Sequence, residues 1–186
     1  MRIIIMNAQR AKLKRVAIFL AATSTALIPA ITHADWSIME LGNLGGGTSH
    51  AYDINDSGQV VGWSDTASGD ASAFITGPNG IGIINLGSLG GDIRDHSGAY
   101  GINDSGQVVG DSRSADRSGI HAFIAGPNGV GMTDLGTLGG NFSHAYDIND
   151  SGQVVGKSSI TGFGHPFHAF ITGPNGVGMT DLGTLG

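Results

Sequence analysis

The chain of 186 residues contains no cysteine, which excludes disulfide bonds, thiolate nucleophiles and cysteine metal ligands. Without a covalent staple, the fold must be stabilised by packing alone. Positive charge is also scarce after residue 34, where fifteen acidic residues accompany only four basic ones, Arg94, Arg113, Arg117 and Lys157. An acidic surface of this kind repels a phosphate backbone, so we expect no nucleic-acid partner.

A long hydrophobic run is missing as well. The apolar stretch Val16–Ile31 is shorter than the roughly 20 residues that a membrane-spanning helix needs. It follows the basic residues 10–15 and precedes small residues at Thr32 and Ala34. This order predicts a helical export signal over residues 1–34, cleaved after Ala34, with an uncleaved anchor helix as the alternative. The remainder would be exported and lie in the periplasm, on the cell surface or outside the cell.

The sequence further lacks the local signatures of common enzymes. It has neither a serine nucleophile elbow nor a phosphate-binding GxxxxGK[ST] loop. Hydrolases that use two carboxylates need them in unlike environments, whereas Asp56, Asp104 and Asp150 occupy equivalent positions of a repeat. We therefore expect no catalytic activity and no cofactor.

Glycine, in contrast, is abundant at 33 residues and regularly spaced. The motif LGxLGG begins at residues 41, 86 and 135, and LGTLG begins at residue 182. Spacings of about 47 residues predict tandem structural repeats. We place the repeats at residues 41–85, 86–134 and 135–181, after a short lead-in at 35–40 and before a fourth start at 182–186.

Each repeat predicts two β-hairpins. In the first, the segments 51–55 and 59–61 flank an Asp-Ser-Gly turn, and the segments 73–76 and 81–86 flank a Gly-Pro-Asn-Gly turn. Four short antiparallel strands per repeat favour an all-β fold of propeller-like blades, with a β-solenoid as the alternative. Three repeats are too few to close a ring, so we expect an open arc, a fragment of a longer array or a ring completed by self-association.

The linked motifs resemble one known family. LGxLGG opens each unit, INDSGQVVG forms its middle, and His121-Ala122-Phe123 and His168-Ala169-Phe170 each precede isoleucine. Together they resemble the HAF-type extracellular repeat family of bacterial exported proteins. The resemblance covers residues 41–186 and implies export and a repetitive β architecture, but no activity. The first repeat departs from it, because Ser72 stands where the others have histidine.

Calcium is the sharpest ligand hypothesis. Alternate oxygen-bearing residues before a glycine are typical of the first half of a calcium loop. The candidate ligands are Asp53, Asn55 and Ser57 in the first repeat and Asp147, Asn149 and Ser151 in the third. The second repeat has Gly101 in place of the aspartate, and no carboxylate follows at Ser64 or Ser158. A simple turn, with glycine in the left-handed conformation, is the alternative and explains all three copies.

Histidines recur at matched positions but do not form a convincing zinc motif. His165 and His168 have ligand-like spacing, yet no third ligand lies nearby in sequence. For the recurring histidines 50, 121, 144 and 168, a hydrogen bond to a backbone carbonyl is the simpler expectation.

Three segments differ between the repeats, at residues 64–72, 111–120 and 157–167. Their polar and aromatic residues are Asp65, Asp70, Arg113, Asp116, Arg117, Lys157 and Phe163. Repeat proteins use such differences for recognition. We expect an exported, non-enzymatic scaffold that presents these loops to a glycan, protein or surface partner. A carbohydrate-active hydrolase or lyase and a structural fragment without a ligand are the alternatives.

Overall fold

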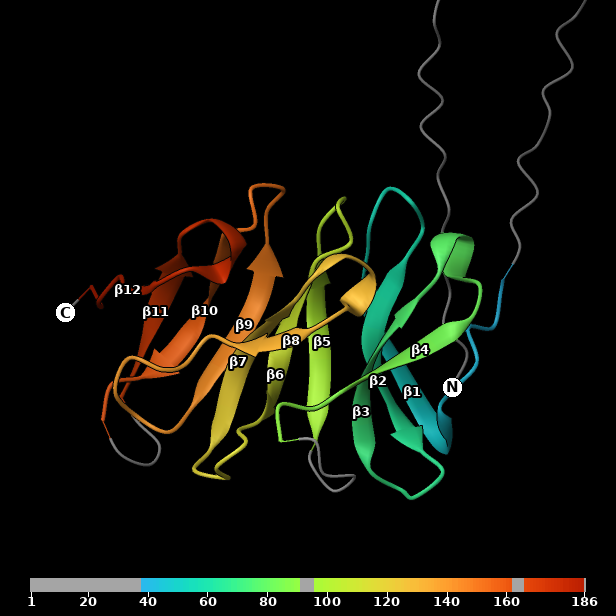
Figure 1. The fold of residues 1–186 in the computed structure, drawn as a ribbon, viewed down its shortest axis with the longest axis horizontal. Helices are drawn as coiled ribbons and strands as arrows, with labels where there is room; N and C mark the ends of the chain where they lie inside the picture. The colour runs from blue at the N-terminus through green and yellow to red at the C-terminus, as the bar shows by residue number, and fades with distance from the viewer. Residues whose placement is uncertain (1–37, 91–95, 162–165, 186) are drawn as a thin grey trace, which may run out of the picture. The chain divides into compact units, whose positions relative to one another are not determined.

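The computed structural model describes residues 38–90, 96–161 and 166–185 (Figure 1). The described residues from Leu41 onward form one compact unit. The predicted signal helix and its cleavage site after Ala34 lie outside the described residues. Within the described ranges, no helix has the length and apolar character needed to cross a membrane.

In the described ranges, twelve strands form three four-stranded antiparallel sheets, which we call blades 1, 2 and 3. Blade 1 consists of β1 (Gly45–Ile54), β2 (Val60–Thr66), β3 (Ala71–Thr76) and β4 (Ile83–Gly87). Blade 2 consists of β5 (Ser97–Ile102), β6 (Val108–Arg113), β7 (Ile120–Ala125) and β8 (Met132–Asp134). Blade 3 consists of β9 (Ser143–Ile148), β10 (Val154–Ser159), β11 (Phe167–Thr172) and β12 (Met179–Asp181).

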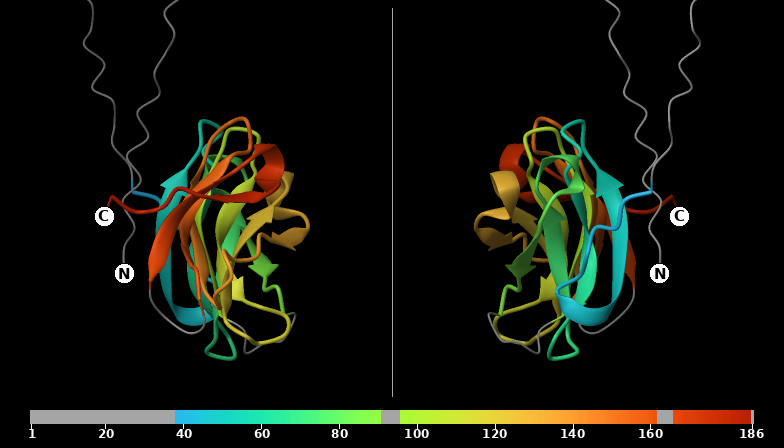
Figure 2. Two further views of the ribbon diagram at one scale, coloured as in Figure 1. Left: turned by 90° about the vertical axis from the view of Figure 1, so that its left-hand side faces the viewer. Right: turned by 90° about the vertical axis from the view of Figure 1, so that its right-hand side faces the viewer.

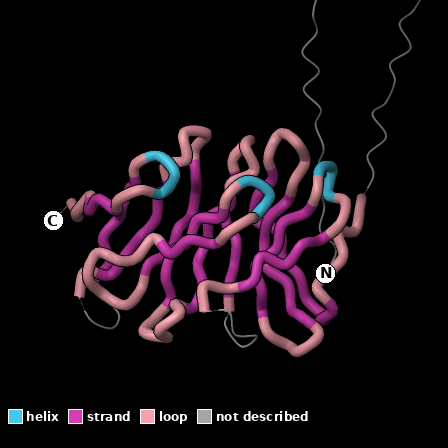
Figure 3. Tube along the Cα trace, viewed as in Figure 1, coloured by secondary structure: helices cyan, strands magenta, loops and turns pink. Residues whose placement is uncertain are grey.

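The expected all-β fold of four-stranded antiparallel units is confirmed. The blades stand side by side in chain order, and the three sheets do not close into a ring (Figure 1). Helix is confined, in the described ranges, to three single 3₁₀ turns, η1 (Pro78–Gly80), η2 (Pro127–Gly129) and η3 (Pro174–Gly176) (Figure 3). In each blade the first and fourth strands form opposite edges of the sheet (Figure 2).

Two kinds of turn fix the hairpins. In the Asp-Ser-Gly turn of blade 1, the side-chain oxygen of Asn55 accepts hydrogen bonds from the backbone N–H groups of Ser57 and Gln59. Gly58 takes a φ of 74°, a conformation that costs glycine little. In the Gly-Pro-Asn-Gly turn, Asn79 has a φ of 57°, which asparagine tolerates better than most residues. The backbone N–H of Asn79 then donates to the carbonyl of Ser57, which binds the two turns together.

The second strands extend further than the sequence motifs predict. β2 continues to Thr66, β6 to Arg113 and β10 to Ser159, so the segments expected to be loops begin as strands. Backbone pairing explains the difference, because ladder hydrogen bonds do not depend on side-chain identity; Ser64 still pairs with Ser72 and Lys157 with Ala169. The variable residues at the start of each segment are therefore held on rigid sheet.

The core lies between the blades, because both faces of blade 2 are covered. Blade 1 contributes Val61, Ala73 and Ile75 to the first interface, and blade 2 contributes Ala99, Ile102, Val108, Phe123 and Ala125. The second interface contains Val109, Ala122 and Ile124 from blade 2 and Ala145, Ile148, Val154 and Phe170 from blade 3. A blade with apolar residues on both faces needs a neighbour on each side to remove them from water.

The LGxLGG motif seals these interfaces. Leu86 and Leu89 pack against the first core cluster, and Leu135 and Leu138 pack against the second. The backbone N–H of Leu89 donates to the buried hydroxyl of Ser112 at 3.0 Å. The same bond joins Leu44 to Ser64 and Leu138 to Ser158. These contacts make the motif a close-packed crossing of the chain between two blades.

We expect Gly110→Ala to destabilise the fold. A Cβ at this position would lie 1.9 Å from the carbonyl oxygen of Gly98, so the backbone of β5 or β6 must shift. The free energy of unfolding in urea should fall by about 1–3 kcal/mol. Gly47→Ala is the matched control, because nothing lies within 4 Å of its added Cβ, and its effect should stay within about 0.5 kcal/mol. Equal stability of the two variants would contradict this account of the glycine.

Candidate functional site

Three tyrosines at equivalent repeat positions lie on the first strands of the blades. Tyr52 is on β1, Tyr100 on β5 and Tyr146 on β9, and we call them the tyrosine row. Each sits at a register shift, for example between the pairs Ala51–Gly62 and Asp53–Val61. A bulge of this kind turns a side chain out of the regular alternation. Accordingly, Tyr52 is 53% exposed and Tyr146 is 48% exposed although both lie in sheet.

The neighbour of each tyrosine differs from blade to blade. The residue after the QVVG glycine is Trp63 in blade 1, Asp111 in blade 2 and Lys157 in blade 3. The indole N–H of Trp63 donates to the hydroxyl of Tyr52 at 3.1 Å. The hydroxyl of Tyr100 donates to the carboxylate of Asp111 at 3.4 Å. The ammonium group of Lys157 lies 5.9 Å from the centre of the Tyr146 ring.

Contacts between blades join these pairs into one surface. The rings of Tyr52 and Tyr100 meet edge to face with centroids 5.2 Å apart. His144 of blade 3 reaches the carboxylate of Asp111 at 2.6 Å. The surface therefore presents the rings and hydroxyl groups of the tyrosines, the carboxylate of Asp111 and the ammonium group of Lys157 in fixed positions.

Further aromatic contacts extend both ends of the row. The imidazole of His50 stacks on Trp63 with ring centroids 4.6 Å apart. At the other end, Phe167 lies 5.0 Å from the Lys157 ammonium group. Aromatic rings next to polar groups suit a ligand that has both apolar faces and hydroxyl groups.

The central tyrosine is held in its protonated form. Burial raises the pKa of Tyr100 above its ordinary value, and the negative charge of Asp111 raises this pKa further. The phenol therefore remains a hydrogen-bond donor to Asp111 over the physiological range, which fixes the orientation of the carboxylate.

The calcium candidates of the first repeat are engaged in hydrogen bonds. The carboxylate of Asp53 accepts the backbone N–H groups of Ile54 at 2.8 Å and Ile102 at 2.9 Å. The side-chain oxygen of Asn55 accepts two N–H groups within the turn, one of them from Ser57. These hydrogen bonds are the ones expected if the segment is a simple turn.

The third repeat shows the same turn. Asp147 accepts the N–H of Ile148, and the side-chain oxygen of Asn149 accepts the N–H of Ser151. Gly152 has a φ of 75°. In the part of the chain that the structure describes, no three His, Asp or Glu side chains gather as a metal-binding group. Calcium binding at the six candidates stays a prediction.

Gly101, which replaces the aspartate in the second repeat, has a packing reason. A Cβ there would lie 3.1 Å from the Cα of Asp147 and 3.2 Å from the carbonyl of Tyr146 on blade 3. The backbone of Ile102, which lacks its own aspartate acceptor, uses Asp53 of blade 1 instead.

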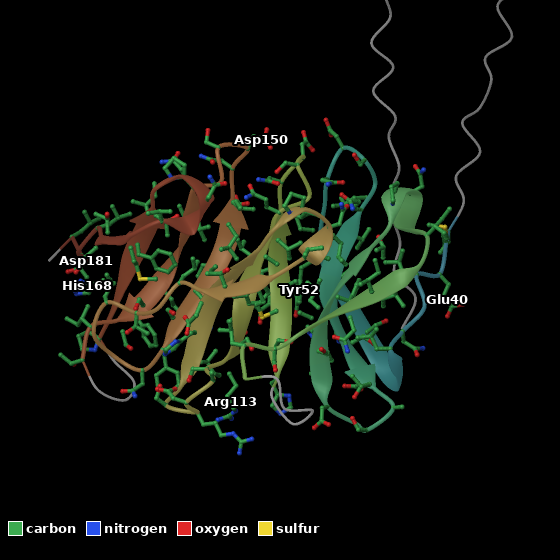
Figure 4. The ribbon with its side chains drawn as sticks, viewed as in Figure 1. Glu40, Tyr52, Arg113, Asp150, His168 and Asp181 are labelled. Atoms are coloured by element: carbon green, nitrogen blue, oxygen red, sulfur yellow. The ribbon has the colours of Figure 1, made fainter. Side chains whose placement is uncertain are left out.

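The recurring histidines bond carboxylates, and the expected bond to a backbone carbonyl is wrong for three of them. His121 pairs with Asp134 at 2.8 Å, His168 with Asp181 at 2.9 Å and His144 with Asp111 at 2.6 Å. The reason is strand register, which places an aspartate of the neighbouring strand or blade beside each ring. Figure 4 shows His168 and Asp181 together in blade 3. His165 lies outside the described residues.

The remaining variable residues lie on strands next to the loops or in the loops themselves. Asp65 is the second-last residue of β2 and Arg113 the last residue of β6, whereas Asp70, Asp116 and Arg117 lie in loops. The backbone N–H of Ser118 and the nearby hydroxyls lower the pKa of Asp116 to about 2, so this carboxylate stays charged and orders its own loop. Phe163 lies outside the described residues.

Sequence reasoning missed Trp63 and the tyrosine row as candidate binding residues. The signal was present, because a tryptophan, an aspartate and a lysine follow otherwise identical QVVG segments. Recognising this signal requires the strand register, which places the residue after the QVVG glycine beside the bulged tyrosine. A comparison of the chain with protein-family models and with curated proteins gives no match.

We expect Asp53→Ala to destabilise the protein more than Asp147→Ala does. The first substitution removes the acceptor of two backbone N–H groups, including that of buried Ile102, whereas Asp147 serves one. Losing the Ile102 acceptor should cost about 1–3 kcal/mol in urea unfolding, with or without a calcium chelator. A calcium-induced rise in Tm that both variants abolish equally would instead establish the calcium hypothesis.

Proposed function

We propose that this protein is an exported, non-enzymatic scaffold that binds a polysaccharide along its tyrosine row. One observation carries the proposal: three constant tyrosines each have a different neighbour, Trp63, Asp111 or Lys157, at one structural position. A constant frame with varied contact residues is how repeat proteins build recognition surfaces. Export and membership of the HAF-type repeat family are part of the proposal and are supported by the leader and the repeat motifs.

The chemistry of the row favours a saccharide over a protein partner. Tyr52 and Tyr146 are half exposed, so each offers an apolar ring face together with a hydroxyl group. A sugar ring has the same combination of apolar C–H faces and hydroxyls. The tyrosines repeat once per blade, and a polymer of repeated sugar units matches such a row better than an irregular protein surface does.

Asp111 supports binding rather than catalysis. Its carboxylate is already bonded to Tyr100 and to His144, so both oxygens are held as fixed acceptors. Glycoside hydrolysis needs an acid and a second carboxylate placed across the bond to be cleaved. The pairing of Asp111 suits a positioned hydrogen-bond acceptor for a sugar hydroxyl.

A glycan array followed by titration of the positive polysaccharides tests this function. Tyr52→Ala and Tyr146→Ala should each weaken binding about tenfold, the effect of losing roughly 1.4 kcal/mol of contact. Ile81→Ala is the control, because Ile81 is also exposed, at 70%, but lies in a turn between β3 and β4.

Unchanged affinity of both tyrosine variants would overturn the tyrosine row as the site. Release of reducing ends from a bound polysaccharide would show that the protein is an enzyme after all. Absence of any binding on the array, together with capture of a defined protein that depends on Tyr52, would replace the glycan by a protein ligand.

A further inference from the structure

The two described interfaces between blades use the same four polar links. From blade 1 to blade 2 they are Asn55 Nδ2 to Asn103 O (3.1 Å), Asp56 N to Asp104 Oδ1 (3.0 Å), Gln59 Nε2 to Asn128 Oδ1 (3.0 Å) and Ala73 N to Ser97 Oγ (2.9 Å). From blade 2 to blade 3 they are Asn103 Nδ2 to Asn149 O (3.0 Å), Asp104 N to Asp150 Oδ1 (3.1 Å), Gln107 Nε2 to Asn175 Oδ1 (3.1 Å) and Ala122 N to Ser143 Oγ (2.8 Å).

These links have a direction. The donor always belongs to the earlier blade and the acceptor to the later one. Blade 3 therefore carries a set of donors on its outer face, Asn149 Nδ2, Asp150 N, Gln153 Nε2 and Ala169 N. Blade 1 carries the complementary acceptors on its outer face, Asn55 O, Asp56 carboxylate, Asn79 Oδ1 and Ser49 Oγ. Ser49 is already oriented like its equivalents, because its hydroxyl donates to Gly42 O as that of Ser97 donates to Gly87 O.

The apolar halves of the two outer faces are complementary in the same way. Val155 is 40% exposed on blade 3, whereas its equivalents Val61 and Val109 are fully buried between blades. Ile54 is 47% exposed on blade 1, whereas its equivalents Ile102 and Ile148 are buried. Each outer face thus repeats one half of an interface that the structure contains twice.

We propose that copies of this chain associate head to tail, with blade 3 of one copy packed on blade 1 of the next. The contact would repeat the four polar links and the apolar packing of the internal interfaces. Contacts between unlike faces produce a ring if the rotation closes and a fibre if it does not. The inference does not rest on glycan binding, although such stacking would extend the tyrosine row from Tyr146 of one copy to Tyr52 of the next.

The leucines of the linking motif decide how the ends fit. Leu41 is already buried on blade 1, with 7% exposure, and Leu44 makes the serine bond of its motif. In the proposed contact, Leu41 and Leu44 would therefore take the places that Leu86 and Leu89 occupy at the first internal interface. Leu182 and Leu185 of the other copy, which are exposed, would move aside.

The test uses two blocked variants of the full 186-residue chain. Val155→Asp blocks the outer face of blade 3, and Ile54→Asp blocks that of blade 1. In analytical ultracentrifugation the wild-type mass should rise with concentration, while each blocked variant alone should stay monomeric. An equimolar mixture should give dimers and nothing larger, because each variant retains one intact face.

Controls keep the outcome decisive. Val177→Asp places the same charge on an exposed turn of blade 3 and should assemble like the wild type. If Ile54→Asp does not fold, Asp56→Ala replaces it, because it removes only the acceptor for Asp150 N of the preceding copy. A chain ending at Asp181 should assemble at least as strongly as the wild type, since Leu182 and Leu185 have no place in the contact.

Three results would overturn the proposal. The first is a wild-type chain that stays monomeric at all concentrations up to about 1 mM, the weak end of specific association. The second is self-dimerisation of either blocked variant, which would indicate contact between like faces. The third is loss of assembly in the chain ending at Asp181.

Discussion

The side chain of Asn103 makes two kinds of contact at once. Its oxygen accepts the backbone N–H of Gln107 and the hydroxyl of Ser105 within its own hairpin, and its amide nitrogen donates to the carbonyl of Asn149 on the next blade. Local turn geometry and the spacing between sheets are therefore set by one residue. The same residue at position 55 sets the first interface. Since a buried amide left without partners is costly, the turn and the stacking of blades stabilise each other.

This coupling explains why the repeats are so alike in their middle segments and so different elsewhere. A change in INDSGQVVG would disturb a turn and an interface together. The position after its glycine is under no such constraint, because its side chain points to the tyrosine row and not into the core. Trp63, Asp111 and Lys157 can therefore differ in size and charge while the strands that carry them stay the same.

The stacking also has consequences for the end blades. Blade 2 is covered on both faces, whereas blades 1 and 3 each keep one face with apolar residues half exposed. Leu41 and Leu44 cover part of the first face because they belong to the motif that precedes a blade. The outer face of blade 3 keeps Val155 and Leu182 exposed. The two ends differ because Leu41 is buried on blade 1, whereas Leu182 after blade 3 is 59% exposed.

The sequence by itself determined the strands, the two turn types and the repeat, because alternation, Asp-Ser-Gly and Pro-Asn-Gly act over a few residues. Gly58 and Asn79 adopt the left-handed conformations that those motifs require. Only the tertiary structure decided which side chains meet. The pairing of His144 with Asp111 and the bulge that exposes Tyr52 depend on register and on the neighbouring blade. Such contacts join residues that are far apart in the chain, and local patterns contain no information about the distance between them.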